Sequence, residues 1–516
     1  MKPSPENRSR LHRTLAVMVL AAASAGLMCA PEARPGTAPA PAASRAGDKL
    51  QDWIVEHTIA VRSIDAADED FGDLEPLIDA IGSARVVQLG EPSHGAGSSF
   101  SAKVRLIKFL HQRMGFDVLA WESGLYDVHL TQTGMRAGDD AVAAAQAGIL
   151  LVWSATEEVR PLFEYAKASQ CTDRPLDMAG FDMQMNAVDA SDHFAADLRS
   201  FVHALRDQAL RERAGELAEQ AIAAHRHLFA RADVMRRIEL DSVRAAVSDK
   251  TPAQSPPETV ATWEKSEAAK LTGRKEDIEA LDQAADALLA MIRTQRAAFL
   301  QVHATGHITF MERAIDNLRG NDRSVYDNER SDRPTAGATA SALFNEGWNR
   351  RDALNARNLR WLVEEGYPGR KIIVWGHNVH LMNAYYAADV RSIHTEPQTG
   401  GLEPSGLAQA KWLGNDVYTI AMTSYEGEDG WNFAKSIAPA PEGSLEWRLH
   451  QLGKPYVFLD LRALDGSRGH PMRKPQSMRI DQYREDTLTD VTRAFNAIFY
   501  IDRMAPATRI RSQSKQ

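Results

Sequence analysis

Short apolar segments that alternate with helical stretches most constrain how this chain can fold. The apolar segments span residues 86–89, 116–121, 176–181, 371–375, 417–422, 456–461 and 498–501. Between the first two segments, apolar residues recur every three or four positions from 104 to 114, as on one face of a helix. Parallel strands need long crossovers, usually helices. The alternation therefore predicts an α/β fold, with a largely parallel sheet covered by helices.

The strand signal disappears between residues 192 and 319. Apolar residues in this block keep helical spacing at Leu198, Phe201, Ile278, Leu281 and Leu288. The pattern predicts an inserted all-helical subdomain at 192–319, which divides the α/β catalytic domain into residues 48–191 and 320–516. Residues 319–342 lack periodicity and are rich in Gly, Ser, Asp and Asn, which indicates a solvated connector or a lid over a site.

The N-terminal residues have the pattern of a processing signal. Four basic residues precede the apolar segment Leu15–Met28, and small residues follow it. This pattern predicts a signal peptide at 1–30, since the apolar segment is short for a membrane span. We expect an exported protein, periplasmic or secreted, with no stable membrane insertion after processing. A lipid anchor at Cys29 is the alternative, and residues 31–47 form a Pro/Ala-rich tether.

Composition excludes several classes of protein. The net charge is −9 and aromatic residues make up only 7% of the chain, which disfavours a nucleic-acid-binding surface. Of the two cysteines, only Cys171 lies beyond the predicted signal peptide. The mature chain can therefore form neither an internal disulfide nor a cysteine-rich metal site.

Residues that can carry out proton transfer follow four of the predicted strands. In chain order they are Glu91 and His94, Glu122, Asp182, and His377 and His380. The carboxyl ends of parallel strands share one edge of the sheet, where ligands bind in α/β proteins. We therefore expect these side chains to converge there and to form an active site.

Sequence motifs narrow the chemistry of that site without settling it. The chain has no G-x-S-x-G elbow, P-loop, dinucleotide fingerprint or H-E-x-x-H motif. The remaining histidines and carboxylates suit two uses. A histidine held by a carboxylate can deprotonate water for attack on an ester, and the same histidines could bind metal. A metal-dependent hydrolase, a metal- or haem-binding periplasmic protein, and a non-catalytic binding protein therefore remain open as alternatives.

Several segments resemble the motifs of the erythromycin esterase family. The segments 90–95 (GEPSHG) and 116–122 (FDVLAWE) resemble its first motif block. Further similar elements are 153–161 (WSATEEVRP), 180–184 (GFDMQ), 351–352 (RD) and 375–380 (WGHNVH). A local helix ion pair is the alternative interpretation of the RD element. The resemblance extends from about residue 50 to the C-terminal strands.

The resemblance implies an esterase that opens macrolide lactones with activated water, without a metal or other cofactor, as in antibiotic resistance. The implied partner is a small-molecule ester or lactone. By position, His94 would be the general base and Glu91 the carboxylate that orients it. Glu122 and His377 would complete the group around the water and the carbonyl.

The resemblance also assigns two further residues to the site. His380 is the second histidine of the 375–380 element, and it would either join the site or orient its neighbour. Lys103 stands where the family has a functional arginine. A lysine is a point charge and not a planar fork, so we expect a difference in how substrate is placed.

Overall fold

The computed structural model describes most of the chain beyond residue 47. The described residues are 48–187, 189–247, 274–331, 340–387, 392–394, 401–431, 434–464, 469–483 and 488–510. The predicted signal peptide (1–30) and tether (31–47) lie outside them. Among the described residues, no helix is long and apolar enough to cross a membrane.

The central sheet contains nine strands among the described residues, in the order β1-β10-β13-β8-β2-β5-β3-β4, with β9 paired to β8. They are β1 (Thr58–Ala60), β2 (Val86–Leu89), β3 (Phe116–Gly124), β4 (Asp177–Asp182), β5 (Lys371–Trp375), β8 (Val417–Asp429), β9 (Lys435–Ile437), β10 (Tyr456–Asp460) and β13 (Ala497–Met504). Neighbours from β13 to β4 are parallel, whereas β1, β10 and β9 pair antiparallel. The predicted largely parallel sheet is confirmed.

Helices cover both faces of the sheet because its strands are apolar on both sides. Strand β2 is buried throughout, and its alternate residues enter different cores. Val87 packs in the core that includes α4 (Gly97–Met114) and α8 (Arg160–Ser169). Val86 packs in the core that includes residues of α15 (Ala340–Trp361) and the π-helical turn Leu362–Gly366. Burial on two faces is typical of parallel sheets.

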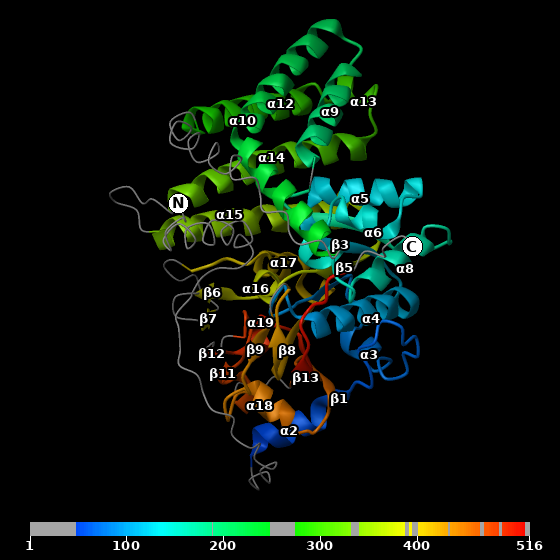
Figure 1. Ribbon diagram of the computed structural model, residues 1–516, viewed down its shortest axis with the longest axis vertical. Coiled ribbons are helices and arrows are strands. Elements are labelled where there is room, and N and C mark those ends of the chain that lie inside the picture. The colour runs from blue at the N-terminus through cyan, green and yellow to red at the C-terminus, as the bar shows by residue number, and fades with distance from the viewer. Residues whose placement is uncertain are drawn as a thin grey trace. The chain divides into compact units, whose positions relative to one another are not determined.

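Shorter elements surround the sheet (Figure 1). The helices are α2 (Lys49–His57), α3 (Leu77–Ile81), α5 (Leu125–Ala137), α6 (Ala141–Gln146), α7 (Leu151–Ser154), α16 (Asn378–Leu381), α17 (Ser405–Leu413), α18 (Leu445–His450) and α19 (Val491–Ala494), with 3-10 turns at Gly414–Asp416 and Pro471–Arg473. A small second sheet has the order β11-β12-β7-β6. Its strands are β6 (Tyr385–Ala387), β7 (Ser392–His394), β11 (Gln476–Ser477) and β12 (Leu488–Thr489).

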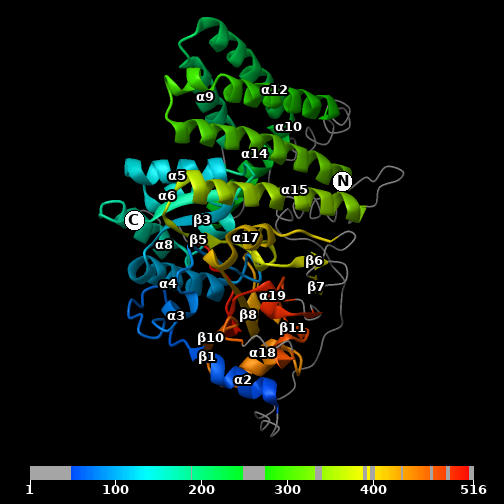
Figure 2. The ribbon, with the colours of Figure 1, turned by 180° about the vertical axis from the view of Figure 1, so that it is seen from behind.

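Five helices form a tier with an apolar core of its own. They are α9 (Ala190–His203), α10 (Gln208–Val247), α12 (Arg274–Thr294), α13 (Arg296–Leu300) and α14 (Thr305–Ser331). Leu198, Ile222, Leu281 and Ile315 lie in this core, which is separate from the cores that cover the sheet. Both ribbon views show α14 lying beside α15, so these two helices connect the tier to the α/β part (Figures 1 and 2).

The connector or lid predicted at 319–342 is wrong where the structure describes it. Helix α14 continues to Ser331 and α15 begins at Ala340, so the domain boundary predicted at 319/320 falls inside α14. Residues 332–339 lie outside the described part. Apolar periodicity is absent because α14 buries polar side chains here. Asp316, Asn317, Asn321 and Asp322 are all at least 94% buried.

Residues 141–169 form three helices, α6, α7 and α8, and not one continuous helix. The break occurs at Gly148, where a Cβ atom would lie 1.9 Å from the Asp127 carbonyl oxygen. Only glycine permits so close a backbone approach. The Ser123 hydroxyl then accepts the N–H of Leu150 at 3.1 Å, which fixes the turn that leads to Trp153.

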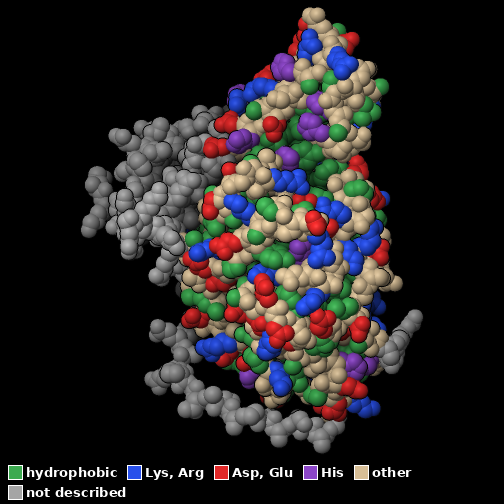
Figure 3. All heavy atoms as spheres, turned by 90° about the vertical axis from the view of Figure 1, so that its right-hand side faces the viewer, with side chains coloured by type: hydrophobic (Ala, Val, Ile, Leu, Met, Phe, Trp, Pro, Cys, Tyr) green, Lys and Arg blue, Asp and Glu red, His purple; other side chains and the backbone are tan. Residues whose placement is uncertain are grey.

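Charged side chains are intermixed on the surface. Figure 3 shows lysine and arginine interspersed with aspartate and glutamate across the face that it draws. On that face no extended patch of basic side chains is seen. A basic patch would be the footprint of a nucleic-acid-binding protein.

Candidate active site

The structure brings all six predicted site residues to the carboxyl edge of the sheet. Glu91 and His94 follow β2, and His377 follows β5 and caps α16, which contains His380. Glu122 lies inside β3, which extends past the predicted end at 121 to Gly124. Lys103 extends into the same cluster from α4.

His94 is held by Glu91. Its Nδ1 lies 2.8 Å from Glu91 Oε1, and a carboxylate can only accept, so Nδ1 carries the proton. The other ring nitrogen, Nε2, has no hydrogen bond to any described residue and keeps its lone pair. The His94 side chain is 12% exposed, whereas Glu91 is 0% exposed. This imidazole can therefore accept a proton from a bound water.

Glu91 is fixed by two further donors. Lys103 Nζ donates to Oε2 at 2.6 Å, and Trp153 Nε1 donates to Oε1 at 2.9 Å. With His94, three donors from three elements surround one buried carboxylate. The carboxylate is thereby locked in the orientation that sets the plane of the His94 ring.

Lys103 lies beneath Glu91 and does not face the outside. Its side chain is 0% exposed, and it also donates to the Gly376 carbonyl at 3.1 Å. Burial lowers the pKa of Lys103 to about 8, although the charge of Glu91 opposes this shift. Any effect of Lys103 on substrate placement must therefore be indirect, through Glu91 or the Gly376 carbonyl.

Glu122 lies at the centre of a second charged cluster. Its Oε2 accepts the backbone N–H of His377 at 2.7 Å, and its Oε1 accepts Arg351 Nη2 at 2.9 Å. Burial by itself would raise the pKa of Glu122, but His380, Arg351 and the other histidines lower it to about 2. Arg351 also binds Asp182, with Nε 3.0 Å from Oδ2. Glu122 is therefore ionised and serves to position the His377 backbone.

His377 uses both of its ring nitrogens within the protein. Nε2 lies 2.9 Å from the Pro92 carbonyl, so it carries the proton, and Nδ1 accepts the N–H of Val379 at 3.3 Å. Burial lowers the pKa of His377 well below its ordinary value, and the nearby His94 adds to this effect. The ring is neutral and packs edge-on to His94, with centroids 5.3 Å apart. We therefore assign it a positioning role.

His380 is also engaged on both sides. Its Nδ1 lies 2.9 Å from Asp352 Oδ2, and its Nε2 lies 3.2 Å from Arg351 Nη1. Burial lowers the pKa of His380, but Asp352 and Glu122 outweigh burial and raise it. Arg351 forms ion pairs with Glu122 and Asp182, and Asp352 holds His380, so both residues contribute to the site beyond a local helix ion pair.

The donor arrangement does not form a metal site. Among the residues that the structure describes, no three His, Cys, Asp or Glu side chains are placed to hold a metal ion. The ring nitrogens of His377 and His380 are already hydrogen-bonded, and Glu91 is paired with Lys103. The metal- or haem-binding alternative therefore has no support in this geometry.

Sequence reasoning assigned no role to several residues that shape the site. Trp153 orients Glu91, Asp352 holds His380, and Trp348 stacks on the His380 ring at 4.3 Å. The sequence contained one indication that α15 contributes to the site. The polar residues at 351, 355 and 358 are spaced so that they share one face of a helix. Asn355 and Asn358 on this face are fully buried.

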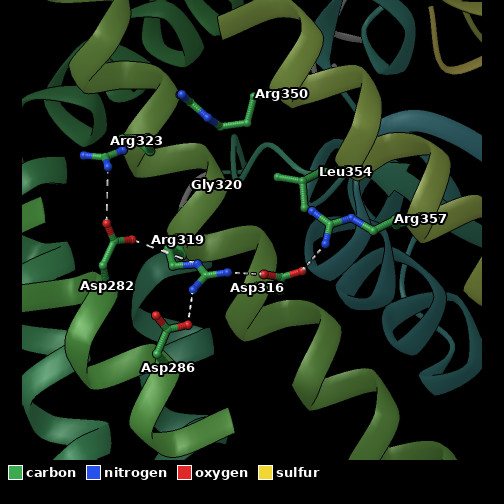
Figure 4. Close-up of a pocket in the computed structure, with 9 residues that line it drawn as sticks. All are labelled: Asp282, Asp286, Asp316, Arg319, Gly320, Arg323, Arg350, Leu354 and Arg357. Carbon is green, nitrogen blue, oxygen red and sulfur yellow. Dashed lines mark hydrogen bonds and ion pairs between the residues drawn. The ribbon is translucent and has the colours of Figure 1, made fainter. Parts of the chain in front are cut away.

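A pocket of about 310 Å³ lies between α12, α14 and α15, apart from the six predicted residues (Figure 4). Its carboxylates pair with its arginines. Asp316 contacts Arg319 at 2.8 Å and Arg357 at 3.5 Å, and Asp282 contacts Arg323 at 3.6 Å. Mutually compensated charges stabilise helix packing here, and we place no reaction in this pocket.

Known proteins resemble this chain in sequence and in fold. The sequence profile of the family described as erythromycin esterase matches residues 111–504. A protein named putative hydrolase YbfO, from Bacillus subtilis, is 26% identical over 89% of this chain and 92% of its own length.

Two solved structures share the fold. A Bacillus cereus protein has a TM-score of 0.66 at 17% identity, over 91% of this chain and 100% of its own. A mutant of erythromycin esterase EreC in its open conformation has a TM-score of 0.56 at 18% identity, over 88% of this chain and 99% of its own.

Proposed function

The chain belongs to the erythromycin esterase family of hydrolases, and we propose that it cleaves a carboxylic ester or lactone with water activated by His94. The observation that carries this proposal is the His94 ring itself. One nitrogen is fixed by a buried carboxylate, and the other has a lone pair and no partner among the described residues.

The proposed reaction begins with water bound at His94 Nε2. His94 takes a proton from the water as the hydroxide attacks the carbonyl carbon, which gives a tetrahedral intermediate. The imidazolium that forms is stabilised by ionised Glu91, which lies 2.8 Å from Nδ1. Lys103 and Trp153 hold Glu91 in place during this step, so the site needs no rearrangement as charge develops.

We propose a macrolide lactone as the first substrate to test. The support is the family and the name of the structural neighbour EreC. Purified protein incubated with erythromycin should give a product heavier by one water in mass spectrometry. If folded protein gives no such product, the macrolide proposal fails, and a panel of alkyl and aryl esters then tests the wider hydrolase proposal.

We further propose that the chain is exported and acts outside the cytoplasm. There it would protect the cell that expresses it from a macrolide. The support is the pattern of residues 1–30. Cell fractionation with N-terminal sequencing should find a processed chain that begins close to residue 31. An unprocessed chain in the cytoplasm would contradict export without affecting the catalytic proposal.

A further inference from the structure

A second carboxyl group, that of Asp429, contacts the loop that carries His94. Asp429 is the last residue of β8, which pairs with β2 through residues 417–420 and continues beyond the end of β2. Its Oδ2 lies 2.9 Å from Ser93 Oγ. The next residue, Gly430, donates its N–H to the Gly95 carbonyl at 3.2 Å. Asp429 is thus fixed directly beside the loop that carries His94.

Ser93 connects this carboxyl group to the outside. Within Gly90–Gly95, only Ser93 and His94 are partly exposed, and the other residues are buried. Ser93 Oγ already accepts the N–H of Gly95 at 3.1 Å. A hydroxyl has two lone pairs and one proton. In the structure the Ser93 hydroxyl donates to Asp429 Oδ2 at 2.9 Å. When Asp429 is protonated the direction can reverse, so that Ser93 Oγ accepts and its own proton points outward.

The surroundings of Asp429 make its ionised form less favourable than that of an exposed aspartate. Burial raises the pKa of Asp429, and this effect outweighs the opposing effects of the Ser93 hydroxyl, Lys435 and His94. The buried Oδ1 atom has no hydrogen-bond partner among the described residues. A buried carboxylate oxygen without a partner is costly when the group is ionised. The neutral acid avoids much of that cost.

A turn with an uncommon backbone conformation is hydrogen-bonded to the loop that carries His94. Gln482 and Tyr483 have φ angles of 46° and 58°, a left-handed conformation that is uncommon for residues other than glycine. The Gln482 N–H donates to the Pro92 carbonyl at 2.7 Å. Burial raises the pKa of Tyr483 well above its ordinary value. Strain of this kind concentrates at functional sites.

Ester hydrolysis needs two proton transfers, because water loses a proton and the leaving alkoxide gains one. We propose that Ser93 and Asp429 supply the second proton, with Ser93 Oγ as the group that contacts the leaving oxygen. This inference rests on the proposed esterase function, and it assigns the two transfers to neighbouring residues of one loop.

The protons and bonds balance through the cycle. His94 takes a proton from water, and the hydroxide forms the new C–O bond. As the C–O bond to the leaving group breaks, Ser93 gives its proton to the leaving oxygen and takes the proton of Asp429. His94 then holds one proton too many and Asp429 one too few. Transfer from His94 to Asp429, through solvent, restores both groups.

The dependence of the rate on the leaving group tests this role. We compare an ethyl ester with the p-nitrophenyl ester of the same acid, chosen from the ester panel. An ethoxide must be protonated as it leaves, whereas a p-nitrophenolate leaves without a proton. For Asp429→Asn, kcat should fall roughly 100-fold or more on the ethyl ester, and less than about threefold on the p-nitrophenyl ester.

Retained p-nitrophenyl ester activity also shows that the variant is folded. Ser93→Ala should give the same selective loss, and Ser93→Thr, which keeps the hydroxyl, should restore the ethyl ester rate. Asp79→Asn, at an exposed aspartate of α3, is the matched control and should change neither rate. If Asp429→Asn does not fold, the Ser93 variants decide alone.

Equal losses on the two esters, or no loss on either, would overturn the role of Ser93 and Asp429, because His94 would then serve both transfers. The esterase function would stand in that case, since the parent enzyme is active. If the parent protein hydrolyses neither erythromycin nor any ester in the panel, the esterase function itself fails and this inference fails with it. The two failures are therefore distinguishable.

Discussion

Two of the histidine–carboxylate pairs in the described part of the molecule make the same short contact in different surroundings. His94 and Glu91 lie at the edge of the sheet, and His225 and Asp322 lie in the helical tier between α10 and α14. The distance from Nδ1 to the carboxylate oxygen is 2.8 Å in both pairs. By this criterion alone, either pair could be part of a catalytic group.

The second ring nitrogen distinguishes the two pairs. His225 Nε2 lies 2.9 Å from Ser191 Oγ, and the side chains of His225 and Asp322 are 2% and 0% exposed. Ser191 itself is 5% exposed, so the serine, histidine and aspartate join α9, α10 and α14 out of reach of substrate. His94 Nε2 has no such partner, and its side chain is 12% exposed.

A histidine held by a carboxylate can therefore be a purely structural unit. What makes it a candidate base is access together with an unengaged nitrogen. A buried polar network that is fully satisfied rigidifies a core, and this is the role that we assign to the helical-tier group.

The largest expected effect is on catalysis at the sheet edge. His94→Ala should lower kcat/KM by roughly 100- to 10,000-fold, with little change in melting temperature, because the side chain is partly exposed. His225→Ala is the matched control, and the folded fraction of that variant should keep the parental kcat/KM. Activity in His94→Ala within a few-fold of the parent would remove the proposed base.

Replacing Lys103 should lower the free energy of unfolding by more than replacing an exposed lysine would. Lys103→Met leaves Glu91 buried without its cation, which should cost about 3–5 kcal/mol in the free energy of unfolding. Urea denaturation measures this loss. Lys103→Arg keeps the charge and should lose less. Equal stability of Lys103→Met and the parent would show that the ion pair does not hold the site together.

The lowered pKa of Glu122 predicts how the free energy of unfolding depends on pH. Its pKa is lowered to about 2 from an ordinary value of 4.5, so the folded state favours the ionised form. The contribution, about 3 kcal/mol, is complete above pH 4.5 and is lost as the pH falls toward 2. The difference in unfolding free energy between the parent and Glu122→Gln should shrink over that range. A difference that stays constant with pH would contradict the assignment.

The smallest effect is expected in the helical tier. His225→Ala leaves Asp322 and Ser191 without one buried partner, which should cost about 1–3 kcal/mol. Thermal melting should show the loss, and kcat/KM corrected for the folded fraction should not change. A fall in corrected kcat/KM comparable with that of His94→Ala would mean that the two pairs are not functionally distinct.

Local sequence predicted the elements whose burial is apolar. The strands at 86–89 and 371–375 have the predicted bounds, because continuous apolar runs have no other stable place in an α/β protein. The polar residues after these strands were predicted to converge because parallel strands end at one edge. Their hydrogen-bond partners Trp153 and Arg351 were not predicted, since each comes from an element far away in the sequence.

The connector was wrongly predicted because polar side chains of α14 and α15 are buried. Asp322 and Asn355 face the interior, where His225 and the backbone N–H of Met183 bind them. Hydropathy treats such residues as exposed, so residues 319–331 resembled a connector. A polar side chain can be buried when its partner is supplied, and that partner lies on another helix.

Periodicity and motifs local in the chain were enough to predict the parallel sheet, the family and the identity of the residues at the sheet edge. Only the tertiary structure decided which of the histidines keeps an unengaged nitrogen. That distinction depends on hydrogen bonds between distant segments, such as His377 to Pro92 and His380 to Asp352. The chemistry of this site therefore depends on hydrogen bonds that form only when distant segments of the chain pack together.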